Sequence, residues 1–304
     1  MSLRTAIQFL LLLISAAFIT AQSIATQPQP CIVESQPNPI AKQYPDLPTG
    51  TLNMTLLIIP IPLTTARKLV PAKWPILEHA YRALIPSLAR NSYPVLVQGG
   101  IDHDIGLEAL DIHLPDFSRI SYSFPFIDLL GDNHTSFTWT PAQLISAAAE
   151  YAVVGSRAYG IATYPSAFDP SCNPYAWRRE GKSLYFQGVS NDTAIRDRKW
   201  AGLEITLLGG QKGEKKARYP IEVFVNVTNQ PIFGDGLSCD RQVRLFNTSL
   251  SEGRRAVRGK VYGDFEPLGE VGEEWKGDGW MVDAAFVEYN GLDCESLQGY
   301  SGTG

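Results

Sequence analysis

Short runs of β-branched and aromatic residues, separated by Gly, Pro, Asn and Asp, dominate the hydrophobic pattern of the chain. Many runs alternate apolar with polar positions, as Ile221–Val227 does, and this period of two is typical of half-buried antiparallel strands. The pattern predicts strands at Leu52–Ile61, Tyr93–Gln98, Leu107–Leu114, Ile120–Ile127, Leu184–Gly188, Leu203–Leu208, Ile221–Val227, Gln242–Asn247, Ala256–Val261 and Trp280–Tyr289.

Helical patterns are sparse by comparison. Thr64–Val70 predicts a short helix that Pro71 ends, and the apolar positions of Ile76–Leu88 share one helical face, with Pro86 ending or kinking that helix. Thr140 and Pro141 are a favourable N-cap and first-turn pair, which predicts a helix running to about Tyr151. Many strands, few helices and no alternation of strand with helix predict a mainly β (α+β) fold built on an antiparallel sheet or barrel, and argue against a nucleotide-binding fold.

The first residues have the layout of a secretory signal peptide: Arg4, the apolar run Ile7–Phe18, and small residues near Ala21. The run is shorter than the roughly 20 residues that a membrane-spanning helix needs, so a membrane anchor is the weaker interpretation. We expect a signal peptide over 1–21, with cleavage after Ala21 or Ser23, and a secreted protein that has no membrane segment after cleavage. A Pro-rich extended leader over 22–50, one domain over 51–290 and a frayed Gly/Ser-rich tail over 291–304 would follow.

Two further features agree with the secretory pathway. Asn-x-Ser/Thr triplets, each a potential glycosylation site, occur at Asn53, Asn133, Asn191, Asn226 and Asn247. The four cysteines show no Cys-x-x-Cys spacing and predict two disulfides in an oxidising compartment rather than a zinc or redox site. Three pairings are open. We favour Cys172 with Cys239 in the body and Cys31 with Cys294 joining the ends, and a reactive cysteine is the less favoured alternative.

Composition and charge exclude some classes of partner. With 19% charged residues and a net charge of −5, the chain has no basic excess for nucleic acid or anionic lipid. The densest titratable cluster is Asp102-His103-Asp104, with Glu108 and His113 nearby. Because successive strand residues point to opposite faces, this cluster is interpreted as an exposed turn rather than a general base or metal site. We expect no metal and no cofactor, and the Ser-His-Asp framing of a hydrolase is absent from the sequence.

The segment Val154–Pro170 resembles the active-site segment of the acetoacetate decarboxylase family, which runs to an aromatic-Pro and then to a pair of lysines. Two flanking segments are also similar to that family: Thr64–Pro71 to the strand, short helix and Pro that open its domain, and Glu222–Gly236 to a later strand and hairpin. The strand beginning near Gly181 follows the segment as it does in the family. Together these matches span about residues 50–260.

The resemblance implies a cone-shaped β-barrel around an apolar pocket for small keto-acids, with a buried lysine that attacks the carbonyl to form a Schiff base. Here Ser166 and Ala167 stand where the lysine pair is expected, and neither can form an imine. Lys215-Lys216, before Tyr219-Pro220, would be an alternative register. Their charged, Gly-rich surroundings are typical of an exposed hairpin loop, where lysine stays protonated.

On this basis we expect Arg157 to hold a substrate carboxylate or enolate, and Tyr159 and Tyr164 to donate hydrogen bonds to a carbonyl. A structural salt bridge for Arg157 and core positions for the tyrosines are equally open. Gln98 and Ser166 are expected to line the substrate pocket, with Gln98 where the family has an acidic residue.

Two classes of function remain from the sequence. One is a secreted enzyme, lyase-type or related, that acts on a small keto-acid or polyketide-like compound without an imine. The other is a non-catalytic secreted glycoprotein that binds a small molecule on the same scaffold. Either one has a small-molecule ligand as its partner, and either could form a homo-oligomer.

Overall fold

The computed structural model describes residues 31, 33, 37–190, 199–208, 217–264 and 274–300. The main strands are β1 (Thr49–Pro62), β2 (Ser92–Leu107), β4 (Phe117–Ile127), β5 (Phe137–Ser146), β6 (Ala162–Asp169), β8 (Leu184–Ser190), β9 (Trp200–Leu207), β11 (Cys239–Leu245), β12 (Arg255–Asp264) and β13 (Glu274–Leu292). Short strands β3 (Ile112–Leu114), β7 (Ala176–Trp177) and β10 (Ile232–Phe233) extend the sheet. The helices are α2 (Leu63–Leu69), α3 (Glu78–Leu84), α4 (Glu150–Arg157) and α5 (Ile221–Thr228), and 3-10 turns lie at Ala41–Gln43, Glu108–Leu110, Ser249–Gly253 and Cys294–Leu297.

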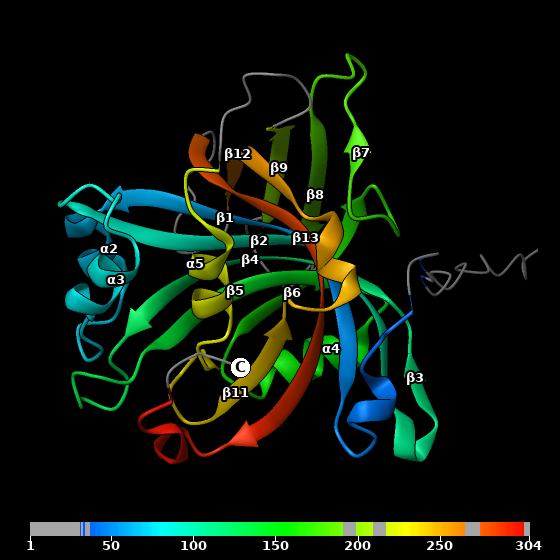
Figure 1. Ribbon diagram of the computed structural model, residues 1–304, viewed down its shortest axis with the longest axis horizontal. Coiled ribbons are helices and arrows are strands. Elements are labelled where there is room, and N and C mark those ends of the chain that lie inside the picture. The colour runs from blue at the N-terminus through cyan, green and yellow to red at the C-terminus, as the bar shows by residue number, and fades with distance from the viewer. Residues whose placement is uncertain are drawn as a thin grey trace, which may run out of the picture.

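The strands close on themselves (Figure 1). The path runs β1-β2-β4-β5-β10-β11-β13-β12-β9-β8-β6, and two extra pairings, β1 with β13 and β5 with β6, complete the closure. One ring passes through β6, β8, β9 and β12, and it forms a closed 9-strand barrel. A second ring instead passes through β10 and β11 and shares β13, β1, β2, β4 and β5 with the first. The expectation of a mainly β fold with a barrel and short helices is confirmed.

The sheet departs from the antiparallel expectation at two places, because β5 pairs in parallel with both β6 and β10. Parallel neighbours require a crossover, and α4 supplies it between β5 and β6. This topology sets α4 beside the end of the second ring (Figure 1).

Three predicted elements were wrong. The predicted strand Leu107–Leu114 is a hairpin in which the 3-10 turn Glu108–Leu110 joins the end of β2 to β3. Ile221–Val227 is helical, and its buried residues Val223, Phe224 and Val227 lie at helical rather than alternating spacing. Thr140 and Pro141 lie inside β5 instead of opening a helix. Pro141 is tolerated there because the pairing of β5 with β4 shifts register between Tyr122 and Phe124, where no regular ladder bond is needed.

Disulfides join Cys31 to Cys172 and Cys239 to Cys294, so the favoured pairing was wrong although all four cysteines are bonded. The expectation of a frayed tail is also wrong over its described part, because Cys294 and Leu297 are buried. The second disulfide fastens this tail to the first residue of β11. Two disulfides are typical of a non-reducing environment. Within the described ranges, no helix has the length and apolar character needed to cross a membrane.

Candidate functional site

A cavity of about 270 Å³ lies inside the ring that contains β10 and β11. Strands β2, β4, β5, β11 and β13 supply most of its wall, and α4 with the following Tyr159 covers one side. Apolar side chains such as Phe117 and Phe286 share the wall with charged and amide groups. The charged lining residues are Asp102, Arg119, Asp240 and Glu288.

Close contact of two glycines holds Tyr159 in this wall. The backbone N–H of Gly234 donates to the carbonyl of Tyr159 at 2.7 Å. A Cβ added at Gly234 would lie 2.3 Å from the carbonyl carbon of Gly160, so a side chain there would force the two segments apart. The Tyr159 hydroxyl donates to Oδ1 of Asn290 at 2.5 Å, and burial raises the pKa of that hydroxyl.

Two guanidinium groups converge on one neutral oxygen. Oε1 of Gln242 accepts from Nη2 of Arg119 at 3.3 Å and from Nε of Arg244 at 3.1 Å. Nε of Arg119 is also 2.9 Å from Oδ2 of the buried Asp102. Burial, followed by the nearby Arg119 cation, lowers the pKa of Arg244, so the positive charge of this buried guanidinium is held at an energetic cost.

A pair of carboxyl groups lies next to these cations. Asp240 and Glu288 are hydrogen bonded to each other, and Glu288 pairs across the sheet with Gln242. Burial and repulsion between the two groups raise the pKa of the Asp240 carboxyl well above its usual range, and burial also raises the pKa of Glu288. Because two adjacent carboxylates with little access to water repel each other, the raised pKa values favour a state in which the pair shares one proton.

The charges of the cluster then balance. Asp102 and the ionised member of the carboxyl pair offset Arg119 and Arg244. The site thus combines a proton donor, a proton acceptor and the Arg119 cation in the wall of the cavity, with the buried Arg244 joined to them through Gln242. The described residues that line the cavity include no lysine.

Only some of the predicted site residues meet at this cavity. Gln98 and Tyr159 line it. Nε2 of Gln98 donates to Oγ of Ser121 at 2.9 Å, while its Oε1 has no hydrogen-bond partner among the described residues.

The other predicted residues are held elsewhere. Nη2 of Arg157 donates to the carbonyl of Thr163 at 2.8 Å and so ties α4 to β6. Tyr164 packs against the core, and the buried Ser166 donates to the carbonyl of Tyr164 at 2.8 Å. Ser166 and Ala167 belong to β6, which is outside the ring that encloses the cavity.

The sequence analysis missed Arg119, Asp240, Gln242, Arg244 and Glu288. One signal was available: Gln242 and Arg244 are polar at alternate positions of the predicted strand Gln242–Asn247, and Asp240 extends this pattern by two residues. Such a row of polar residues on a barrel strand faces either the solvent or a polar interior. Which of the two it faces depends on how the sheet closes.

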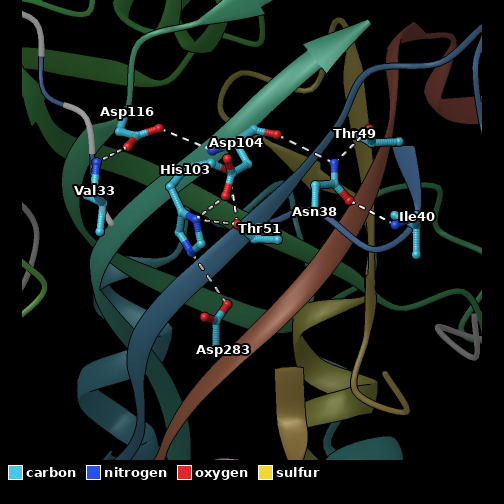
Figure 2. A network of polar contacts seen from close by, with 9 residues as sticks. All are labelled: Val33, Asn38, Ile40, Thr49, Thr51, His103, Asp104, Asp116 and Asp283. Carbon is cyan, nitrogen blue, oxygen red and sulfur yellow. Dashed lines mark hydrogen bonds and ion pairs between the residues drawn. The ribbon is translucent and has the colours of Figure 1, made fainter. Parts of the chain in front are cut away.

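The interpretation of Asp102-His103-Asp104 as an exposed turn was wrong. The three residues lie in β2, where Asp102 and His103 are buried. Figure 2 shows Nδ1 of His103 near Oγ1 of Thr51, at 2.7 Å, and near Oδ2 of Asp104, at 2.9 Å. Its Nε2 lies 3.6 Å from Oδ1 of Asp283. Burial lowers the pKa of His103, but the hydrogen bonds to Asp283 and Asp104 outweigh it and leave the pKa raised.

The same network fastens the segment before β1 (Figure 2). Asp116 accepts from the backbone N–H of Val33 at 2.5 Å and from that of Asp104 at 3.1 Å. Nδ2 of Asn38 donates to Oγ1 of Thr49 at 2.9 Å. His103 is therefore placed to stabilise the packing of several elements. Across the described ranges, no group of three or more His, Cys, Asp or Glu side chains is arranged to hold a metal ion.

The expected glycosylation sites differ in accessibility. Asn133 and Asn247 are exposed, whereas Asn226 is half-buried in α5. Asn53 is half-buried in β1, which is paired on both sides. Asn191 and the Lys215-Lys216 pair lie outside the described residues.

The described residues thus define a mainly β protein with a closed barrel and a polar, partly charged cavity within its strands. No protein-family model matches the chain, and no curated protein matches it.

Solved structures with a similar backbone include the enduracididine biosynthesis enzyme MppR complexed with pyruvate, with 12% identity, 86% of this chain and 97% of that chain covered, and a TM-score of 0.44. Another is an acetoacetate decarboxylase-like enzyme from Sphingomonas wittichii RW1, with 9% identity, coverage of 81% and 92%, and a TM-score of 0.44. A third is acetoacetate decarboxylase from Legionella pneumophila, with 11% identity, coverage of 82% and 88%, and a TM-score of 0.41. At such values the chemistry of the site has to come from this chain's own residues.

Proposed function

We propose that this chain is a lyase-type or related enzyme that acts on a small keto-acid by proton transfer, without a Schiff base. The observation that carries the proposal is the oxygen of Gln242 held between Arg119 and Arg244, beside the Asp240–Glu288 pair. A substrate carboxylate that displaced the Gln242 side chain would take the place of this neutral oxygen and gain charge-assisted hydrogen bonds from both guanidinium groups. The proposal also includes secretion, because the disulfides and the sequence of residues 1–21 both favour it.

The carboxyl pair would supply acid and base together. The ionised Glu288 would take a proton from the carbon next to the carbonyl, while the protonated Asp240 would donate its proton to the carbonyl oxygen. The product is an enol, and the pair has exchanged one proton for another with no change in net charge. Reversal of both transfers regenerates the keto-acid. Tyr159 would donate to the carbonyl oxygen in place of its hydrogen bond to Asn290.

Hydrogen exchange tests this step directly. Pyruvate in D₂O is incubated with the full chain, and loss of its methyl protons is followed by ¹H NMR. The wild-type protein is expected to accelerate exchange, and Glu288→Gln is expected to reduce the rate by about 100-fold or more, as for loss of a general base. Glu295→Gln, an exposed change of the same kind in the following 3-10 turn, should leave the rate unchanged.

Borohydride supplies a second arm of the same experiment. Mass spectrometry after reduction in the presence of pyruvate is expected to show no lysine adduct. A trapped adduct, or exchange that persists in Glu288→Gln, would contradict the proposed mechanism. Binding of pyruvate without any exchange by the wild-type protein would instead favour the non-catalytic binding protein.

A further inference from the structure

The outer face of the sheet formed by β6, β8, β9 and β12 carries a row of side chains, none of which lines the cavity. Strands β8, β9 and β12 lie in the upper part of Figure 1. Cross-strand pairing aligns Asp169 with Gln187, Gln187 with Gly202, and Gly202 with Tyr262. The row therefore crosses four neighbouring strands, about 14 Å at the usual spacing between strands.

Gly202 lets one aromatic ring lie flat on this face. A Cβ added at Gly202 would lie 2.5 Å from Cε2 of Tyr262, so the ring covers the backbone where a side chain would otherwise stand. The ring of Trp200 is 5.8 Å from that of Tyr262, and both residues are only half-buried. Together the two rings, which are tilted by 50° to each other, form an aromatic platform at the β9–β12 end of the row.

Polar groups next to the platform are held in place by neutral partners. Asp169 accepts from the hydroxyl of Tyr185 and from Nε2 of Gln187, each at 3.2 Å. The guanidinium of Arg178 lies 4.3 Å from the centre of the Tyr185 ring and donates to the Tyr262 hydroxyl at 2.9 Å. Glu204 accepts from the Ser183 hydroxyl at 3.0 Å. The face thus presents oriented donors and acceptors of both signs beside aromatic rings.

We propose that this face, the Tyr262 platform (Asp169, Arg178, Tyr185, Gln187, Trp200 and Tyr262), binds a chain of neutral sugars. Sugar rings stack their C–H faces on aromatic rings, and their hydroxyl groups both donate and accept hydrogen bonds. Asp169 and Glu204 would repel a nucleic acid or another polyanion, and Arg178 would disfavour a polycation. A polar row of this kind also lacks the apolar core of a protein interface.

A hollow beside the platform extends the surface available to such a chain. Trp177, which is 56% exposed, lines it together with Arg178, Tyr185 and Glu204. This site does not rest on the proposed function, because its strands β6, β8, β9 and β12 contribute no residue to the catalytic cavity.

Calorimetry with the full chain and cellohexaose, laminarihexaose or chitohexaose tests the site. We expect binding of at least one of these probes, and we expect Trp200→Ala and Tyr262→Ala each to weaken it about tenfold or more, as for loss of an aromatic anchor. Tyr289→Ala is the matched control, because Tyr289 is half-buried and also lies against an arginine, Arg241 at 4.0 Å, but on β13. It should bind as tightly as the wild-type protein.

Circular dichroism checks that each variant folds. If an aromatic-to-Ala variant does not fold, Gln187→Ala tests the proposal instead, because the Gln187 side chain is half-exposed. This variant loses the hydrogen bond of Gln187 to the sugar and no longer holds Asp169 in place, so about threefold weaker binding is expected. Absence of binding to all three probes would overturn the proposal. Equal binding by the wild-type protein and the platform variants, or an equal loss in Tyr289→Ala, would also overturn it.

Discussion

At the residue scale, the candidate site depends on the position of one proton. Asp240 is buried and the adjacent Glu288 is half-buried, and Cys239, next to Asp240 in the chain, is fixed by its disulfide to Cys294. A carboxyl group whose pKa is raised by folding binds its proton more tightly in the folded state than in the unfolded state. The stability of the protein therefore falls as pH rises from the unfolded pKa, near 3.8 for Asp240, through the raised folded pKa.

We predict that Asp240→Asn reduces this pH dependence, because the amide is neutral and removes the repulsion with Glu288. Urea unfolding between pH 4 and pH 8 should show a flatter decline in the free energy of unfolding for the variant. At the upper end the variant should be more stable than the wild-type protein, by about 1.4 kcal/mol for each unit by which folding raises the pKa. Parallel pH curves for the two proteins would contradict the prediction, and Glu295→Gln serves as the control.

Sequence reasoning reached Gln98 and Tyr159 at this scale but not the charged centre. Arg119 and Glu288 come from strands that are far apart in the chain, so nothing local predicts that they meet. Asp102 was noticed, but the strand rule that successive residues face opposite ways led to a turn. In the structure both faces of β2 are buried at Asp102 and His103, so alternation no longer separates inside from outside.

At the element scale, His103 connects β2 with β1 and β13. Asp104, Asp283 and, through Asp104, Asp116 are the charged groups around it, and Asp102 precedes it on the opposite face. The raised pKa means that the charged form is stabilised in the folded protein. This contribution is complete below the unfolded pKa of 6.5 and is lost as pH rises through the folded pKa.

We predict that His103→Gln destabilises the protein more at pH 5 than at pH 9. Loss of a buried hydrogen-bonded group should cost about 1 to 3 kcal/mol at the higher pH, with a further loss at the lower pH from the missing charge interactions. Urea unfolding at the two pH values measures both terms. A difference between wild type and variant that is constant, or larger at pH 9, would show that His103 does not act through its charge.

Most strands were predictable because half-buried strands show a local period of two. The wrong predictions have physical causes that the local pattern of the sequence does not contain. Helix α5 contains β-branched residues at alternating positions, yet it buries Val223, Phe224 and Val227 on one helical face. Pro141 was taken as a helix start, but a register shift in the β4–β5 pairing accommodates it. In both cases tertiary packing overrides the local propensity.

At the scale of the whole molecule, ring closure decides which polar side chains become interior. The two rings share five strands, and only the ring with β10 and β11 encloses the charged cavity. The sequence predicted a barrel. It did not predict that β5 pairs with β6 and that β13 pairs with both β1 and β11, because these pairings join strands that are far apart in the chain. Cys239 meets Cys294 because β11 pairs with β13, whereas Cys31 and Cys172 lie outside the named strands, where no strand pattern predicts their pairing.

Titration of the Asp240 and Glu288 carboxyl carbons with ¹³C NMR decides whether this carboxyl pair keeps a proton for catalysis. We predict that the pair loses its two protons in separate steps and that the later step lies well above the ordinary aspartate value of 3.8. In Glu288→Gln the pKa of Asp240 should fall, because the repulsion is removed. Titration of both groups in the ordinary carboxyl range in the wild-type protein would contradict the account.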